Sequence, residues 1–163
     1  MREIHICSQK ELKYLLREGK IDINNSYALI SSSYPLDIPE LSHMDYSFEC
    51  YDDIDFDCLG RVFSIEAANR FSRAIKENDK IQHFWCVCDG GVRRSSAVAA
   101  SILRFWGRHQ DEISLIWGNP TKEPNVWVYR LMSNALGVPI DDIDPDLLIH
   151  TNRTAIRTAM RRK

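Results

Sequence analysis

The sequence predicts a single three-layer α/β domain, with a central mixed but mostly parallel sheet flanked by helices. Three observations lead to this fold class. Short apolar runs of strand character alternate along the chain with longer segments of helical periodicity. The length of 163 residues fits one domain with a substantial core. Finally, an apolar run at residues 84–87, a glycine-containing loop and a small-residue run at 97–100 form a strand, tight loop and buried helix.

The first part of the chain is predicted to hold three strands and one helix. Residues 3–7 form a short strand, and the Ser-Gln-Lys-Glu sequence at 8–11 is a capping box that starts a helix with leucines at helical spacing. Residues 26–32 are apolar enough for a buried strand, which ends before two prolines. Residues 46–51 alternate in the strand manner.

The second part is predicted to be mostly helical around one central strand. Ser64 caps a helix that runs to about residue 77, and residues 81–87 form the central strand. The next helix, residues 95–106, is nearly apolar all round and should be buried. Two further helices follow, a short one at 112–117 and a longer one at 125–136 that stops at a Gly-x-Pro sequence.

Composition and charge exclude several classes of protein. The net charge is −2, so no nucleic-acid partner is expected. No apolar run approaches the roughly 18 residues of a membrane span, and the N-terminus lacks the core of a signal peptide, so a cytoplasmic location is expected. The five cysteines show no C-x-x-C spacing, which favours free thiols and predicts no metal site or cofactor. The oligomeric state stays open.

The most informative stretch runs from Cys88 to Ser95 and has the features of a phosphate-binding loop between a strand and a buried helix. Gly90 and Gly91 permit a loop whose backbone N–H groups turn inward. The helix that begins at about Ser95 directs its positive dipole end to the same point. Arg94 adds a planar fork of donors for two phosphate oxygens. The same donors should stabilise a thiolate at Cys88.

The sequence Cys-x-x-Gly-x-x-Arg-Ser resembles the signature loop of the cysteine-dependent protein tyrosine phosphatases, and residues 96–100 resemble their small dual-specificity branch. Pro124-Asn125, which opens an apolar helix, is a second match, and the resemblance spans roughly residues 46–137. One departure is Val87, where the family usually has a histidine that braces the loop.

The resemblance implies a role for each residue of the loop. Cys88 would be the nucleophile, Arg94 would hold the transferred phosphoryl group, and Ser95 would assist departure of the thiolate. The expected substrate-binding residues are Asp89, Gly90, Gly91, Val92, Arg93 and Arg94.

The general acid is expected in the aspartate-rich segment that follows the third predicted strand. Asp53 ends that strand directly and is preferred, whereas Asp57 lies closer to the family's usual interval before Cys88 and stays open. Asp55 ranks third, and Asp52 is expected to face the other side. At least two of these four carboxyl groups belong to an ordinary solvated turn.

The predicted function is hydrolysis of a phosphomonoester, in a phosphorylated protein or another substrate, through a phosphocysteine intermediate. Residues 1–150 would form the phosphatase-like catalytic domain, and residues 151–163 a basic C-terminal tail. Two alternatives stay open: a phosphate-binding module that has lost turnover, because Val87 replaces the histidine, and a rhodanese-like or arsenate-reductase-like thiol enzyme. The sequence leaves the substrate open among phosphotyrosine, phosphoserine or phosphothreonine, phosphoinositide and RNA 5′-phosphate.

Overall fold

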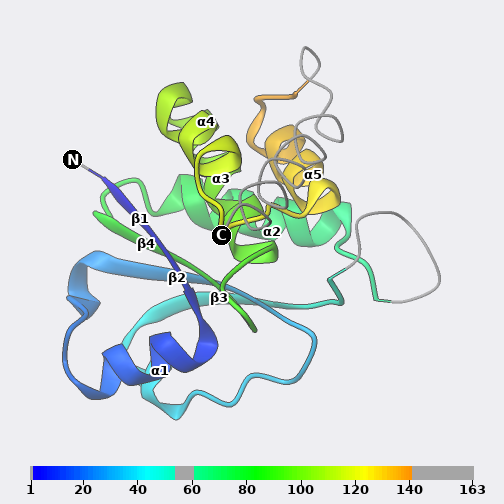
Figure 1. Ribbon diagram of the computed structural model, residues 1–163. Helices are drawn as coiled ribbons and strands as arrows, with labels where there is room; N and C mark the ends of the chain where they lie inside the picture. The colour runs from blue at the N-terminus through cyan, green and yellow to red at the C-terminus, as the bar shows by residue number, and fades with distance from the viewer. Residues whose placement is uncertain (1, 54–60, 141–163) are drawn as a thin grey trace, which may run out of the picture.

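A parallel sheet of four strands organises the chain in the computed structural model, which describes residues 2–53 and 61–140. The strands are β1 (Glu3–Ser8), β2 (Ser26–Ser32), β3 (Asp45–Cys50) and β4 (His83–Cys88). They lie in the order β1-β4-β2-β3, which places β4 in the interior as predicted (Figure 1). The α/β fold class is confirmed. All three strand pairings in this sheet are parallel, so the antiparallel strand of a mixed sheet has no counterpart in the described ranges.

Helices cover both faces of this sheet, which gives the three predicted layers (Figure 1). One face packs against α1, and the other packs against the group of helices α2 to α5. Their bounds are α1 (Gln9–Arg17), α2 (Ile65–Glu77), α3 (Arg94–Phe105), α4 (His109–Trp117) and α5 (Val126–Leu136), with short 3₁₀ turns η1 (Ile23–Asn25) and η2 (Pro39–His43).

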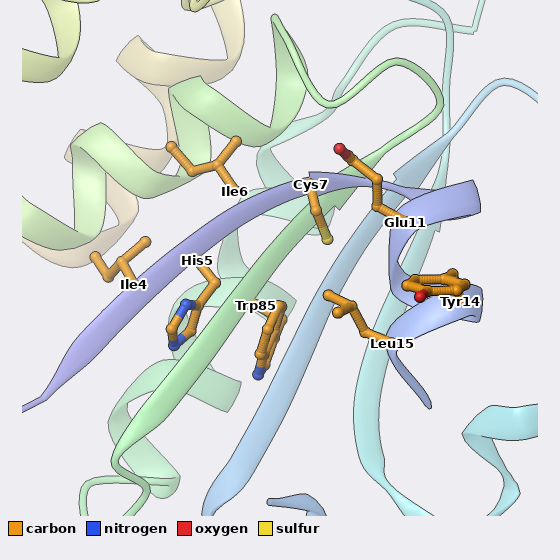
Figure 2. Close-up of a pocket in the computed structure, with 8 residues that line it drawn as sticks. All are labelled: Ile4, His5, Ile6, Cys7, Glu11, Tyr14, Leu15 and Trp85. Atoms are coloured by element: carbon orange, nitrogen blue, oxygen red, sulfur yellow. The ribbon is translucent and has the colours of Figure 1, made fainter. Parts of the chain in front are cut away.

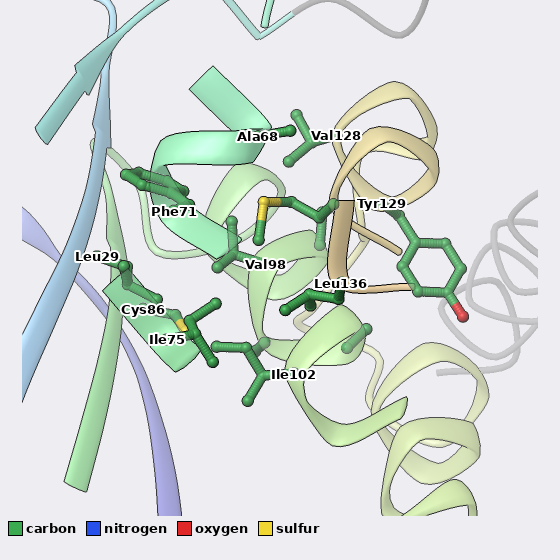
Figure 3. Packing of buried hydrophobic residues seen from close by; sticks show 14 of the residues in the cluster. Leu29, Ala68, Phe71, Ile75, Cys86, Val98, Ile102, Val128, Tyr129 and Leu136 are labelled. Atoms are coloured by element: carbon green, nitrogen blue, oxygen red, sulfur yellow. The ribbon is translucent and has the colours of Figure 1, made fainter. Parts of the chain in front are cut away.

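The strands are buried on both faces because successive side chains point to opposite sides of the sheet. Leu29 and Cys86 pack with α2, α3 and α5, and Figure 3 shows them facing that helix layer. Ile30 and Val87, the next residues along β2 and β4, pack on the α1 side. All seven residues of β2 are buried, which agrees with the apolar run that predicted the strand.

Helix α3 is the buried helix that the sequence predicts. Residues 97–100 have no exposed surface, since α3 lies between the sheet and α5. It begins at Arg94, one residue before the expected start, and Arg93 is the N-cap residue. Ser95 is therefore inside the first turn and does not cap the helix, which leaves its hydroxyl available for another partner.

The predicted starts of α1 and α2 agree with the structure, whereas α4 begins at His109, three residues before the predicted start at residue 112. Ser8 and Glu11 form the capping box of α1, and Ser64 accepts a hydrogen bond from Ala67 N–H at the start of α2. None of the helices within the described ranges is long and apolar enough to span a membrane. The expected basic tail, residues 151–163, lies outside the described residues.

Candidate active site

Cys88 is the last residue of β4, at the carboxyl edge of the sheet where the loop to α3 begins. Cys88 is 3% exposed, and its Sγ lies 3.1 Å from the Ser95 hydroxyl oxygen. Because α3 begins at the adjacent loop, its unpaired N–H groups and positive dipole end lie beside the thiol. The arrangement offers a sulfur atom with one hydroxyl partner at the base of an amide-rich loop.

Donors from the segment before α5 hold the carbonyl groups of the loop. Lys122 Nζ donates to Gly91 O at 2.5 Å, Glu123 N–H to Val92 O at 3.3 Å, and Asn125 N–H to Arg93 O at 3.1 Å. Because these three successive carbonyl groups accept hydrogen bonds from the segment before α5, the N–H groups of the loop remain available for another partner. The N–H groups of residues 90–92 have no hydrogen-bond partner in the described part of the chain. Such a set of amides can bind an anion.

Gly91 is the one glycine of the loop that the backbone requires. Its φ is +65°, and a Cβ there would lie 2.5 Å from Ser8 N and 2.7 Å from the carbonyl carbon of Cys7. The loop therefore packs directly on the junction between β1 and α1. Gly90 has open space around it and no positive φ, so the expectation that both glycines supply special backbone angles is wrong for Gly90.

The side chain of Arg94 is buried and held on three sides. Its Nη1 donates to Ser33 Oγ at 3.0 Å and to the Tyr51 carbonyl at 2.7 Å, and its Nη2 donates to Asp89 Oδ2 at 2.6 Å. The guanidinium also lies 5.7 Å from the centre of the Tyr51 ring. Its Nε is buried and has no hydrogen-bond partner within the described residues. A fixed guanidinium with an unpaired donor is a ready partner for an oxyanion.

Asp89 holds Arg94 and joins three parts of the chain. Besides Arg94, its carboxylate accepts hydrogen bonds from Gln9 Nε2 at 2.7 Å, Ser32 Oγ at 2.8 Å and Ser33 N–H at 3.1 Å. Burial acts to raise the pKa of Asp89, but the hydrogen bonds from Ser33, Arg94 and Ser32 outweigh it and lower that pKa below its usual value. Asp89 was expected to bind substrate, and its carboxylate instead faces these four donors.

Asp53 lies beside the same loop. Its Oδ1 accepts a hydrogen bond from Asn125 Nδ2 at 2.7 Å, and its Oδ2 lies 3.8 Å from Arg93 Nε. The side chain of Asp53 is 31% exposed, so solvent reaches it. The competing candidates Asp55 and Asp57 lie outside the described residues. Asp52 pairs with Arg61, whose Nη2 donates to its carboxylate at 3.2 Å.

Asn125 connects Asp53 to the loop and to α5. Its Oδ1 caps α5 by accepting a hydrogen bond from Val128 N–H at 3.0 Å, while its Nδ2 and N–H reach Asp53 and Arg93. Asn125 is therefore both the N-cap of α5 and a brace of the loop. The remaining loop residue, Val92, is 37% exposed and lies at the rim.

Of the other described cysteines, Cys7 and Cys86 are buried and Cys50 is exposed. Burial raises the pKa of the Cys7 thiol to about 12, and burial also raises that of Cys86, which has no exposed surface. Neither thiol is therefore suited to act as a nucleophile near neutral pH. Cys50 is exposed, with its sulfur 3.1 Å from Arg61 Nη1.

The contacts that support the site from distant segments have no signal in the sequence. Lys122 on the loop carbonyl, Tyr51 under Arg94, and Ser32 with Ser33 on Asp89 come from three different parts of the chain. No local pattern signals such contacts. The only available clue was topological, since the carboxyl ends of parallel strands meet at one edge of a sheet.

Known structures share this fold at low sequence identity. The phosphatase domain of Yvh1 from Chaetomium thermophilum superimposes with a TM-score of 0.57 at 13% identity, covering 87% of this chain and 96% of that domain. PTPMT1, solved in complex with PI(5)P, gives a TM-score of 0.53 at 12% identity, covering 77% of this chain and 85% of that one. No protein-family model matches the sequence, and a search of curated proteins finds no similar sequence. The predicted resemblance to the cysteine-dependent phosphatases is confirmed for the fold.

Proposed function

We propose that this protein is a phosphomonoester hydrolase of the cysteine phosphatase type. One observation carries the proposal: the Cys88 sulfur lies at the base of a loop that offers three unpaired amide N–H groups, next to the dipole end of α3. A phosphoryl group held there presents three oxygens to donors. Stabilisation of developing negative charge by such fixed donors is a large term in phosphoryl transfer.

The proposed reaction has two steps. The Cys88 thiolate attacks phosphorus in line, forming an S–P bond as the P–O bond to the leaving group breaks, and a carboxylic acid protonates the departing oxygen. Water then attacks the phosphocysteine, the S–P bond breaks and the thiolate is restored, while the carboxylate takes a proton from water. The Ser95 hydroxyl, 3.1 Å from Sγ, would donate to the departing thiolate.

Arg94 and the loop amides would hold the equatorial oxygens of the phosphoryl group. Arg94 is prepared for this role, because Asp89, Tyr51 and Ser33 already fix its guanidinium and leave Nε unpaired. Val92 and Arg93 would form the rim of the site. These contacts need no metal ion or cofactor, since the guanidinium and the dipoles supply the positive charge.

The general acid is proposed to be Asp53, with Asp57 as the competing candidate. Asp53 lies beside the loop, where Asn125 and Arg93 contact its two carboxylate oxygens. Turnover by Asp53→Asn and by Asp57→Asn distinguishes the two candidates. Each variant is measured with p-nitrophenyl phosphate and with a phosphate ester that has a poorer leaving group. Only the variant that lacks the acid should lose far more rate on the poorer leaving group, since that alkoxide needs the proton.

The decisive experiment is turnover of p-nitrophenyl phosphate by the wild type and by Cys88→Ser, with vanadate as inhibitor. The wild type should release phosphate, vanadate should compete, and Cys88→Ser should lose turnover. Vanadate binding without turnover in the wild type would instead favour the phosphate-binding module, which Val87 suggests. A persulfide on Cys88 after incubation with a sulfur donor, again without turnover, would favour the sulfur-transfer alternative.

A further inference from the structure

Three metal-binding side chains converge at the opposite end of β1 and β4 from Cys88. Glu3 and His5 lie on the same face of β1, two residues apart, and His83 is the direct partner of Glu3 in the parallel pairing of β1 with β4. Their donor atoms all lie within 4.8 Å of one another. The proposed phosphatase chemistry uses none of these groups.

The spacing of the three donor atoms is that of a tetrahedral metal site. His5 Nε2 lies 3.2 Å from His83 Nδ1, and Glu3 Oε2 lies 3.6 Å from His5 Nε2 and 3.4 Å from His83 Nδ1. Zn²⁺ bonds to imidazole nitrogen and carboxylate oxygen are about 2.0–2.2 Å long, which at tetrahedral angles separates two donors by about 3.4 Å. The triangle therefore fits one zinc ion, with a fourth position for water.

The surroundings hold His5 in the required orientation. Its ring stacks on Trp85 with centroids 4.2 Å apart and an interplanar angle of 18°, and Figure 2 shows the two rings side by side. In this position its Nε2 lies close to both His83 Nδ1 and Glu3 Oε2.

The site is open to solvent. The side chains of His5 and His83 are 32% and 28% exposed, and that of Glu3 is 53% exposed. His5 also lines a groove of about 490 Å³ between β1 and α1 (Figure 2). An ion can thus enter without any rearrangement of the fold.

We propose that Glu3, His5 and His83 form a Zn²⁺ site that fastens the edge strand β1 to β4. His83 lies about 80 positions after Glu3 and His5, so one ion would link two distant parts of the chain. Because the site forms only when β1 pairs with β4, binding of the ion would stabilise the folded state. At about 3.3 Å per residue, the length of β4 separates the site from Cys88 by more than about 15 Å. The ion therefore stabilises the fold and takes no part in turnover.

Calorimetry with Zn²⁺ and absorption spectroscopy with Co²⁺ test the site in full-length protein. Every sample carries Cys88→Ser, so that the candidate nucleophile does not bind metal. One Zn²⁺ should bind per chain, and Co²⁺ should give the visible bands of a four-coordinate nitrogen and oxygen site without a thiolate charge-transfer band. Zn²⁺ should also raise the Tm by several degrees, because it binds only the folded state.

Matched variants decide the assignment. Glu3→Gln and His83→Gln should each weaken Zn²⁺ binding at least tenfold, whereas His43→Gln, at an exposed histidine of η2, should leave it unchanged. Glu3→Gln alters an exposed side chain, so it remains informative if a histidine variant fails to fold. Equal Zn²⁺ affinity in Glu3→Gln, His83→Gln and the parent would overturn the proposal. So would the absence of stoichiometric binding in the parent.

Discussion

Asp89, the residue after Cys88, and Arg94, the first residue of α3, are joined by a 2.6 Å ion pair across the loop. The pair matters because Val87 stands at a position where the cysteine-dependent phosphatases, which this loop resembles, usually have a histidine that braces the loop. Here Val87 is fully buried on the α1 side of the sheet. The loop is braced instead by the Asp89 contacts, by Gly91 on the β1–α1 junction, and by Lys122 on a loop carbonyl.

Replacing Asp89 by asparagine should impair both stability and activity. An amide has one acceptor oxygen, so its NH₂ group would face donors that the carboxylate now satisfies from Gln9, Ser32, Ser33 and Arg94. We expect a loss of about 1.5–3 kcal/mol in the free energy of unfolding, the range for hydrogen bonds to a charged group. Urea unfolding measures it, and kcat/KM should fall because Arg94 loses an anchor. Unchanged kcat/KM would show that Ser33 and Tyr51 hold Arg94 unaided.

The same carboxylate should make stability depend on pH in the acid range. The pKa of Asp89 is lowered in the folded protein, so its contribution is complete above the unfolded value of about 3.9 and is lost as pH falls through the folded value. The difference in unfolding free energy between wild type and Asp89→Asn should therefore be constant from about pH 5 to 7 and shrink below about pH 4. Urea titrations at several pH values measure this difference, and a difference that stays flat below about pH 4 contradicts the assignment.

Gly91→Ala should destabilise the protein far more than Gly90→Ala. The new Cβ at 91 would overlap two backbone atoms at the end of β1 and would sit at φ +65°, whereas position 90 has open space. We expect a loss of about 2–3 kcal/mol or more at 91 and less than about 0.5 kcal/mol at 90. Thermal unfolding of the two variants provides the comparison. Equal Tm values would mean that the loop can move off the Cys7–Ser8 junction.

The contrast between these two glycines shows where sequence reasoning ends. Periodicity and caps predicted the elements well, because Ser8, Ser64 and Asn125 satisfy helix ends through neighbours a few residues away. The motif also located Cys88 and Arg94. It could not tell Gly90 from Gly91, since the requirement at 91 comes from a strand about 80 positions earlier. Nor could it show that the Asp89 carboxylate faces Arg94.

Asn125→Asp should separate the capping role of this residue from its contact with Asp53. The new carboxylate can still cap α5, but it replaces the Nδ2 donor with an oxygen that repels Asp53. Because Asn125 is fully buried, the new charge should cost about 1–3 kcal/mol of stability even with the cap kept, and kcat should fall at least about tenfold if Asp53 is the acid. Ser64→Ala is the control, because it removes the cap of α2 and costs about 1 kcal/mol without altering turnover. Unchanged kcat in Asn125→Asp would favour Asp57.

Ser95→Ala should slow the second chemical step more than the first. The Ser95 hydroxyl lies 3.1 Å from the Cys88 sulfur and does not cap α3, so its natural partner is the thiolate that leaves when phosphocysteine is hydrolysed. A hydrogen bond to a charged group contributes about 1.5–3 kcal/mol, which corresponds to about 10–150-fold in kcat. Rapid mixing with p-nitrophenyl phosphate should then show a burst of nitrophenol followed by a slow steady state. Ser101→Ala, which removes another buried hydroxyl of α3, should keep wild-type kinetics. If Ser95→Ala instead slows the burst and the steady state equally, the hydroxyl serves to position Cys88 for attack.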